Sequence, residues 1–539
     1  MRRYLALLSL AALPLAVLAV FFVLPVSGML GRGFADGPGA VLEVLGRPRV
    51  HRVLWFTVWS AGAATAVSLL LGLPAAHVLH RLDFPLRRVV RALLLVPFVL
   101  PTVVVGVAFR QLLGESGPLG GLGLDGTPVA IVAGLAFFNV SVVIRTVGAA
   151  WESLDARPGE AAAALGASPS QVFRTVTLPA LRSAIVSAGS VVFLFCATSF
   201  GVVLTLGGLR YSSVETEIYL LTTNLLDLQA AAALSILQLV AITALLLLAG
   251  RLRAVPGSVS RVVSRPRRPR RADVPQLVAA LVLLVLVAAP VLTLVVGSLH
   301  VDGAWSLANY RALQTPGDDG ALLVPVTDAL LVSLRTAVDA TWMSMLLGVL
   351  VAVTVTRRSR SRTERRVRGL LDGFFMLPLG VSAVTLGFGF LITLDRPPLD
   401  LRDSPLLVPL AQALVALPLV VRTVVPVLAG IDDRQRQAAA SLGAGPLRAV
   451  LTVDLPVVWK PLLAAAGFAF AVSLGEFGAT SFLARDEHPT VPVVIFRLIG
   501  HPGAMNYGMA LAASVVLAAT TTVAMLVVER LRVGSVGAL

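Results

Sequence analysis

The sequence has one cysteine, one lysine and few charged residues, which make up 14% of its 539 positions. Because Cys196 stands alone, no disulfide within the chain and no cysteine-based metal cluster is expected. The lysine, Lys460, lies in "VVWKPLL", which lacks the glycine-rich context of a phosphate-binding loop. The sequence therefore predicts a chain that is not an enzyme and does not hydrolyse ATP itself, and it indicates no cofactor and no metal.

The sequence is instead rich in long apolar segments. Hydrophobic residues make up 57% of the chain, more than a soluble protein of this size can bury. Apolar runs of about 20 residues, enough to cross a bilayer, recur throughout. They predict an all-α polytopic membrane protein with about twelve transmembrane helices. The expected helices lie near 5–29, 52–79, 89–113, 127–150, 183–207, 229–250, 274–299, 327–356, 367–393, 404–428, 460–483 and 506–529.

The net charge of +15 comes mostly from arginines in alternate loops between these runs. This bias is the one that the positive-inside rule expects, so we predict a bacterial plasma (inner) membrane protein with both termini in the cytoplasm. Residues 251–273, which include "SRPRRPRR", read as a basic cytoplasmic linker beside anionic lipid headgroups. This explains the charge without a nucleic-acid partner.

The two halves of the chain repeat one another. "EAAAALGASPSQVFRTVTLP" from Glu160 matches "QAAASLGAGPLRAVLTVDLP" from Gln437, and the same spacing pairs Phe200 with Phe477. The upstream "VPFVLPTVVVGVAF" matches "LPLGVSAVTLGFGF". We therefore expect two parallel repeats of six helices each, 1–250 and 274–539, related by an axis along the membrane normal, with a path between them.

The repeated segment, expected within 151–182 and 429–459, suits docking better than catalysis. Its alanines favour a helix with small side chains on the surface, and a glycine then permits a sharp turn. Ser168 and Pro169 are typical of the cap and first position of a second short helix, which Pro179 is expected to close. The segments' candidate coupling residues are Glu160, Ala161, Ala162, Gly166 and Pro179, with Gln437, Ala438, Ala439, Gly443 and Pro456.

This pattern resembles the EAA loop of the permeases of binding-protein-dependent ABC importers. The resemblance covers essentially the whole chain and implies the type I importer permease fold. It also implies two ATPase subunits in the cytoplasm, which bind the loops, and a substrate-binding protein outside the membrane. Gln437 replaces the family's glutamate, which puts one charged contact in doubt and makes unequal ATPase contacts a possibility to test.

Ionisable residues inside a membrane are the first candidates for a transport path. Glu476, in "SLGEFGAT", is the sharpest, and its repeat partner is Ser199. Glu476 either lines the path or holds the bundle together through hydrogen bonds. The "CATSFGVVLTLGG" and "SLGEFGATSFLARDEHPTVPVVIFRLIG" stretches resemble the fused permeases for ferric iron and thiamine. "GEFGAT" is also similar to molybdate and sulfate permeases, and polyamine permeases are a further alternative.

Three other hypotheses remain open at this point. His77 and His80 share a helix face with Asp83, a spacing that suits a metal, although polar residues at a helix end commonly just meet water and headgroups. A secondary transporter driven by ions would need carboxylates within the helices and no paired docking loops. A membrane scaffold without transport explains the duplication poorly.

Overall fold

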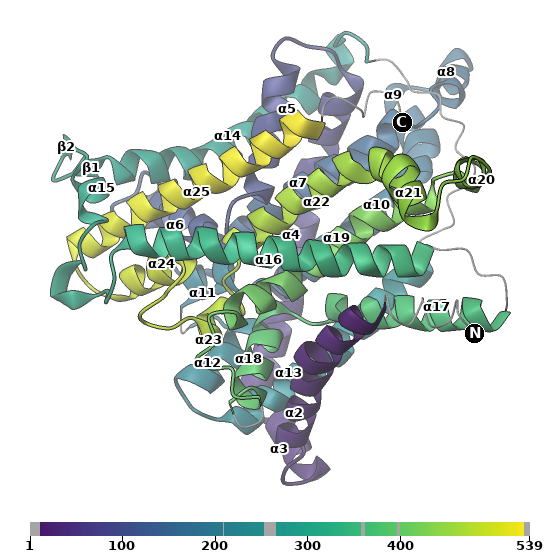
Figure 1. The fold of residues 1–539 in the computed structure, drawn as a ribbon. Helices are drawn as coiled ribbons and strands as arrows, with labels where there is room; N and C mark the ends of the chain where they lie inside the picture. Colours follow the sequence, from purple (N-terminus) through teal and green to yellow (C-terminus); the bar gives the residue numbers. More distant parts are fainter. Residues whose placement is uncertain (1–10, 209, 253–265, 357–361, 396–398, 533–539) are drawn as a thin grey trace.

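The computed structural model describes residues 11–208, 210–252, 266–356, 362–395 and 399–532, and most of them are helical (Figure 1). The first half contains η1 (Ala19–Val23), α2 (Leu24–Gly33), α3 (Pro38–Gly46), α4 (Pro48–Arg81), α5 (Arg87–Leu95), η2 (Val96–Phe98), α6 (Thr102–Leu113), η3 (Gly120–Leu122), α7 (Pro128–Glu152), α8 (Arg157–Ala164), α9 (Pro169–Val172), η4 (Phe173–Thr177), α10 (Leu178–Ala197), α11 (Gly201–Gly207), α12 (Val214–Thr223) and α13 (Leu228–Leu252).

The second half repeats this order with small additions. It contains η5 (Arg271–Asp273), α14 (Val274–Ser298), β1 (His300–Val301), β2 (Ala304–Trp305), α15 (Ala308–Ala312), η6 (Asp318–Gly320), α16 (Val326–Thr356), α17 (Arg362–Phe375), η7 (Leu377–Gly380), α18 (Ala383–Thr393), α19 (Leu407–Ala429), α20 (Asp433–Ser441), α21 (Pro446–Ala449), η8 (Val450–Asp454), α22 (Leu455–Leu474), α23 (Thr480–Leu483), α24 (Val491–Gly500) and α25 (Ala504–Arg532). The strands β1 and β2 form a small antiparallel hairpin.

The all-α, membrane-spanning architecture confirms the predicted fold class, but the count of twelve helices is not confirmed. Within the described residues, ten helices are long and apolar enough to cross a bilayer, or eleven if the bent pair α5–α6 is one span. The apolar helices α18 and α24 are shorter than a full span.

Four of the predicted helices are broken in the structure. The expected helix 89–113 bends by 104° between α5–η2 and α6, where Pro97 and Pro101 interrupt the ladder of backbone hydrogen bonds. The expected helix 367–393 stops at Phe375 and restarts at α18. Helices 183–207 and 460–483 each end early and continue as the short α11 and α23. The pattern of apolar residues in the sequence does not reveal these breaks, because the segments on both sides of each break are equally hydrophobic.

The first membrane helix of each half packs against the other half. Leu18 and Phe22, which lead into α2, pack in a cluster with Phe390 and Leu414 of the second half, and the rings of Phe21 and Phe390 lie 6.0 Å apart. In the opposite direction, α14 of the second half packs on α4 and α6. The two repeats are therefore interlocked.

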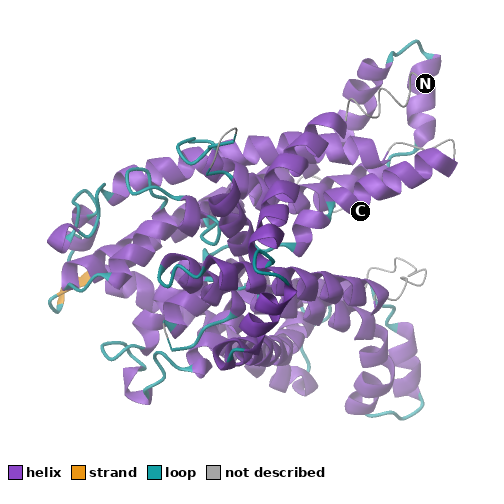
Figure 2. Cartoon of the chain, turned by 90° about the horizontal axis from the view of Figure 1, so that it is seen from below, coloured by secondary structure: helices purple, strands orange, loops and turns teal. Residues whose placement is uncertain are grey.

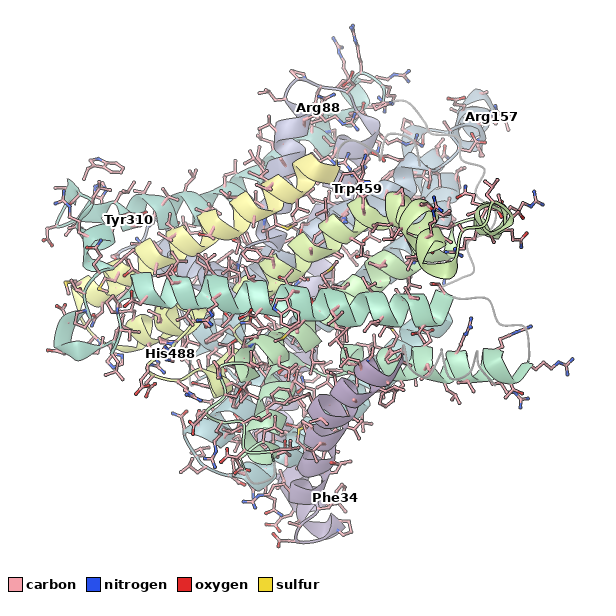
Figure 3. All side chains as sticks on the ribbon, viewed as in Figure 1. Phe34, Arg88, Arg157, Tyr310, Trp459 and His488 are labelled. Atoms are coloured by element: carbon pink, nitrogen blue, oxygen red, sulfur yellow. The ribbon has the colours of Figure 1, made fainter. Side chains whose placement is uncertain are left out.

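The repeated segments project from one end of the molecule. In Figure 1, α8 and α20 lie at the right, whereas α15 and the β1–β2 hairpin lie at the left. Figure 2 shows the hairpin at the left end again from below. Arg157 at the start of α8 and Tyr310 in α15 mark these two ends in Figure 3.

Candidate functional site

The first repeat segment, residues 157–177, is a helix, a tight turn and a second helix. Gly166 follows α8 with a φ of +88°, a conformation that glycine adopts without strain. The amides of Gly166 and Ala167 donate to the carbonyls of Ala163 and Ala162, at 3.0 and 3.1 Å, which is the Schellman pattern of helix ends. The turn leaves the Leu165 side chain 89% exposed.

The second helix begins as the sequence predicts but does not end where it predicts. The Ser168 hydroxyl and the Gln171 side chain form a capping box, and Pro169 takes the first helical position. Pro179 does not close the segment. Instead, α9 runs through the π-helical turn η4 into the membrane helix α10, with the Leu178 amide bonded to the Phe173 carbonyl. Because proline has no N–H and its ring crowds the carbonyl four residues earlier, the wider turn accommodates it.

The second repeat segment, residues 433–454, has the same geometry. Asp432 caps α20, and Gly443 turns the chain with a φ of +84°. Leu442 occupies the place of Leu165 and is 88% exposed. The π-helical turn η8 leads into α22 just before Pro456. Exposed residues of the two segments include Glu160 and Ala161 in the first and Gln437 and Ala438 in the second.

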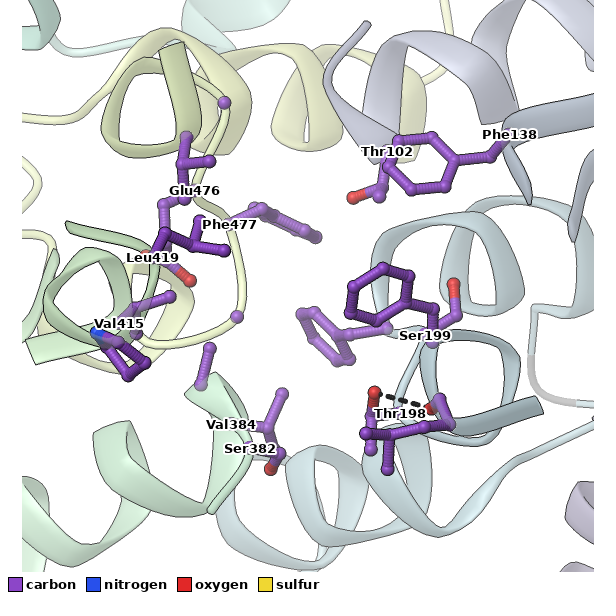
Figure 4. Close-up of a pocket in the computed structure, with 18 of the residues that line it drawn as sticks. Thr102, Phe138, Thr198, Ser199, Ser382, Val384, Val415, Leu419, Glu476 and Phe477 are labelled. Atoms are coloured by element: carbon purple, nitrogen blue, oxygen red, sulfur yellow. Dashed lines mark hydrogen bonds between the residues drawn. The ribbon is translucent and has the colours of Figure 1, made fainter. Parts of the chain in front are cut away.

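A cavity of about 440 Å³ lies between the two halves, a size typical of small-molecule sites. Ser199 and Glu476, the predicted path residues, both line it and come from opposite walls (Figure 4). Most of the wall is apolar, and its aromatic residues are Phe22, Phe98, Phe138, Phe195, Phe200, Phe468 and Phe477.

Glu476 lies in the loop between α22 and α23 and is 7% exposed. Its Oε1 accepts the amide of Ala479 at 2.8 Å, and its Oε2 accepts the amide and the hydroxyl of Thr480. The carboxylate thus holds the broken helix in shape while its residue faces the cavity. The structural role considered from the sequence is thus confirmed, and the role in the transport path stays a prediction that its place on the cavity wall supports.

Four aromatic rings separate this cavity from a second one of about 300 Å³. Phe200 and Phe477 line the first cavity and stack with ring centroids 5.1 Å apart. Tyr219 and Phe496 line the second cavity, and each packs on the nearer phenylalanine at 5.3 and 5.5 Å. These are distances of favourable ring contacts. The four rings form two pairs related by the repeat, so both halves contribute equally to the barrier, which we call the aromatic partition.

Comparison with known proteins supplies the family. A family model described as "Binding-protein-dependent transport system inner membrane component" matches residues 68–254 and 344–532, one match in each half. The chain belongs to this family.

Individual relatives agree with the family. Over 462 residues the permease is 28% identical to the thiamine transport system permease protein ThiP of Brucella abortus (strain 2308), covering 83% of this chain and 82% of the relative. It is 28% identical over 465 residues to ThiP of Escherichia coli (strain K12), covering 83% of both chains. The molybdenum transport system permease protein ModB of Mycobacterium bovis is 34% identical over 223 residues, 40% of this chain and 83% of the relative.

The permease is therefore a multi-pass inner-membrane transport subunit of a binding-protein-dependent system, as the EAA-type pattern predicted. The family excludes the ion-driven secondary transporter and the scaffold. The histidine pair also has another role: His80 Nδ1 lies 2.7 Å from Glu152 Oε1, and His77 Nε2 lies 3.6 Å from Asp273 Oδ1. Among the described residues, no group of three or more His, Cys, Asp or Glu is placed to hold a metal ion.

Different contacts hold the two repeat segments where they join the membrane helices; we call these joining parts, η4 and η8 with their neighbours, the stems. In the first, Phe173 of η4 stacks on Trp151 with ring centroids 6.4 Å apart. In the second, Arg436 Nε donates to Asp454 Oδ1 at 2.8 Å. Gly159 stands where Arg436 does in the repeat and offers no such bond. The asymmetry noted at Gln437 thus extends into the stems.

Sequence reasoning missed most of the cavity wall and the aromatic partition. The repeat had already paired Phe200 with Phe477, and the same spacing pairs Tyr219 with Phe496. Aromatic residues at matched positions next to a symmetry axis were the available signal. Glu215 was also missed; it is fully buried and sits behind the cavity wall.

Proposed function

We propose that the permease imports thiamine and is driven by two separate ATPase subunits that dock on the two repeat segments at the cytoplasmic face. An external binding protein delivers cargo to the opposite face, and both termini are cytoplasmic. The residues that couple ATP hydrolysis to transport are Glu160, Ala161, Ala162, Gly166 and Pro179, with Gln437, Ala438, Ala439, Gly443 and Pro456.

One observation carries the coupling: two matched segments at one end of the molecule each present an exposed leucine on a glycine turn. Leu165 and Leu442 are almost fully exposed although both are large and apolar. A single exposed leucine is common on protein surfaces, but two at matched positions of the repeat, each beside a glycine turn, support a shared docking role. The family is binding-protein-dependent, and the chain has no phosphate-binding loop, so the partner that fits is an ATPase with a cleft for each segment.

The domain division follows the same logic. Residues 1–250 and 274–539 are the two permease repeats, each with one coupling segment, joined by the basic linker 251–273. This division is supported by the two family matches, 68–254 and 344–532. Ser199 and Glu476 lie on the route of the cargo, and the aromatic partition is the barrier that must open toward the outside.

Thiamine is the favoured cargo because the thiamine permeases match the permease over 83% of its length, through both halves. Molybdate is the second candidate, since ModB has the higher identity, although it matches only 40% of this chain. Ferric iron, the other cargo considered from the sequence, appears in the name of none of the relatives described above.

The test replaces the two exposed leucines by serine, Leu165→Ser with Leu442→Ser. We expect co-purification with the ATPase subunits and uptake of labelled thiamine to fall at least tenfold, because a few residues carry most of the binding energy of an interface and each leucine loses its apolar burial. Leu323→Ser is the matched control, since Leu323 is 70% exposed and precedes α16 rather than lying in a repeat segment. Retained ATPase binding in the double variant contradicts the docking role, and uptake of molybdate instead of thiamine contradicts the cargo.

A further inference from the structure

Three of the hydroxyl groups that line the large cavity, those of Ser190, Thr198 and Ser382, donate their hydrogens to the protein itself. The Thr198 hydroxyl donates to the Leu194 carbonyl at 2.9 Å, the bond drawn in Figure 4. The Ser190 hydroxyl donates to the Val186 carbonyl at 2.8 Å. A hydroxyl has one hydrogen and two lone pairs, so each of these groups offers the cavity an acceptor and no donor.

Ser382 repeats this arrangement on the opposite wall. Its hydroxyl donates to Glu215 Oε2 at 2.9 Å and accepts the amide of Thr385 at 3.0 Å. Glu215 is fully buried and also accepts a hydrogen bond from the Gln238 amide. Its repeat counterpart is Pro492, so only one side of the molecule has this network. The Ser382 hydroxyl also lies 3.0 Å from Thr385 Oγ1. Its one hydrogen is therefore used within this network, and Ser382 has no donor left for the cavity.

Asn139 adds an acceptor that is still without a donor. Its Nδ2 donates to the Leu135 carbonyl at 2.9 Å and to Cys196 Sγ at 3.3 Å. Its Oδ1 accepts no hydrogen bond from the described residues, although Asn139 is only 2% exposed and lines the cavity. Buried acceptors are nearly always paired, so an orphan at a cavity wall calls for a donor from outside the chain.

The remaining wall favours a flat, positively charged molecule. The Glu476 side chain, when ionised, is an acceptor only, and seven phenylalanines line the cavity. Aromatic rings attract a cation that lies over their faces. Arg422 is the lining residue with a cationic side chain; it is exposed and takes part in another interaction within the chain. Within the part of the chain that the structure describes, the hydroxyls of Thr102 and Ser199 have no hydrogen-bond partner, so each can accept or donate.

We propose that this cavity is itself a cargo-binding site, which recognises an aromatic organic cation through the hydrogen-bond donors that the cation presents. The inference rests on the proposed import function and adds a second selection step inside the membrane, independent of the external binding protein. An oxyanion such as molybdate needs donors, and most polar groups of this wall are acceptors; the donors it holds are the exposed Arg422 and the hydroxyls of Thr102 and Ser199.

The experiment measures binding of labelled thiamine to the purified full chain in lipid nanodiscs, without ATPase or binding protein. Oxythiamine, in which a carbonyl replaces the amino group of the pyrimidine, is the competitor because it exchanges a donor for an acceptor at nearly constant shape. We expect thiamine to bind at least tenfold more tightly than oxythiamine, the discrimination that one lost hydrogen bond with an unpaired partner gives.

Substitutions of cavity-lining residues test whether these residues cause the preference for thiamine over oxythiamine. Thr198→Val and Asn139→Leu keep volume and remove acceptors, and we expect each to weaken thiamine binding about tenfold and to shrink the preference over oxythiamine. Ser235→Ala is the matched control, because Ser235 is a buried serine that donates to the Ala231 carbonyl at 2.8 Å and lies outside the cavity.

Equal binding of thiamine and oxythiamine overturns the inference, as does unchanged preference in both Thr198→Val and Asn139→Leu. If the assembled importer takes up thiamine while the chain alone binds none, the inference fails and the proposed function stands. If the chain binds thiamine selectively while the assembled importer does not move it, the proposed function fails and the site stands.

Discussion

At the scale of single residues, the two turns need glycine because of the backbone conformation and not because of crowding by neighbouring atoms. Gly166 has a φ of +88°, and a Cβ added there would meet nothing within 4 Å. Any cost of substitution therefore comes from the left-handed backbone alone, about 1 kcal/mol for a residue with a side chain.

Gly166→Ala should consequently loosen the end of α8 without disturbing the membrane helices. We expect faster hydrogen exchange of the α8 amides, by about fivefold for 1 kcal/mol. Gly159→Ala is the matched control within the same helix: Gly159 has helical geometry, and alanine there should slow exchange. Slower exchange in Gly166→Ala would contradict the role of the turn.

Asp227 shows how a residue outside the membrane spans responds to pH. Partial burial opposes its ionisation, but the Ala230 amide and the Arg47 guanidinium, at 2.9 Å each, outweigh burial and lower the pKa of the carboxyl. Since the pKa in the folded state lies below the unfolded value of about 4, the carboxylate adds stability above that pH and loses it as pH falls through the folded pKa.

Asp227→Asn should keep the helix cap and remove only the charge. We expect it to lower the thermal unfolding midpoint slightly at pH 7, because an exposed ion pair contributes only about 0–1 kcal/mol, and we expect the difference from the wild type to shrink at pH 3 as the pH approaches the folded pKa. Thermal melts of both proteins at the two pH values measure this. A gap of the same size at pH 3 would show that the charge is not the cause.

At the scale of elements, the π-helical turns link the repeat segments to the membrane helices. Both η4 and η8 end two residues before a proline, Pro179 or Pro456, whose missing N–H cannot complete the normal ladder. A π-helical turn has one residue more than an α-helical turn, and one residue corresponds to about 100° of rotation along a helix. The prolines thus set the direction in which α8 and α20 point.

Replacing both, Pro179→Ala with Pro456→Ala, should let these turns relax toward an α-helix and rotate the segments. We expect the amount of cargo moved per ATP hydrolysed to fall several-fold while the protein still folds, because the substitution restores a donor. Transport and ATP hydrolysis measured together on the assembled importer decide this. Pro290→Ala, in the interior of α14, is the control for removing a helix proline.

These elements also mark how far sequence reasoning reaches. The helix, glycine turn, Ser168 cap and Pro169 start were predictable because they depend on neighbours within four residues. The π turns were not, since Pro169 and Pro179 carry the same local signal and only the continuing membrane helix distinguishes them. The break at Pro101 was missed for a similar reason: its cost is compensated by packing against distant segments, which apolar periodicity does not record.

Some residues of the cavity could also be predicted from the sequence, and others could not. Glu476 and Ser199 were recognisable because a charge in an apolar run and its repeat partner stand out in the sequence. Asn139 and Ser382 did not stand out, since membrane helices often carry such residues bonded to their own backbone. Their importance depends on which acceptors their donor groups bond to, and only the three-dimensional structure shows these contacts.

At the scale of the whole molecule, the exchange of first helices decides whether the two halves can separate. The surface between α2 and α18 is close: a Cβ on Gly28 would lie 2.0 Å from the Thr393 side chain. Glycine at this position lets the helices approach, as small residues do at contacts between membrane helices. A covalent linker is then not needed for the halves to stay together.

We therefore expect that a chain cut between Leu252 and Pro266, or two halves expressed as separate chains, will co-purify and retain most of the transport. Gly28→Leu should reduce this association strongly, because the leucine side chain would overlap Thr393 and force α2 away from α18. Gly31→Leu lies on the same helix, with nothing within 4 Å of its Cβ, and should leave association unchanged. If the cut halves separate, or if both glycine variants behave alike, the exchanged helices do not hold the repeats together and the linker does.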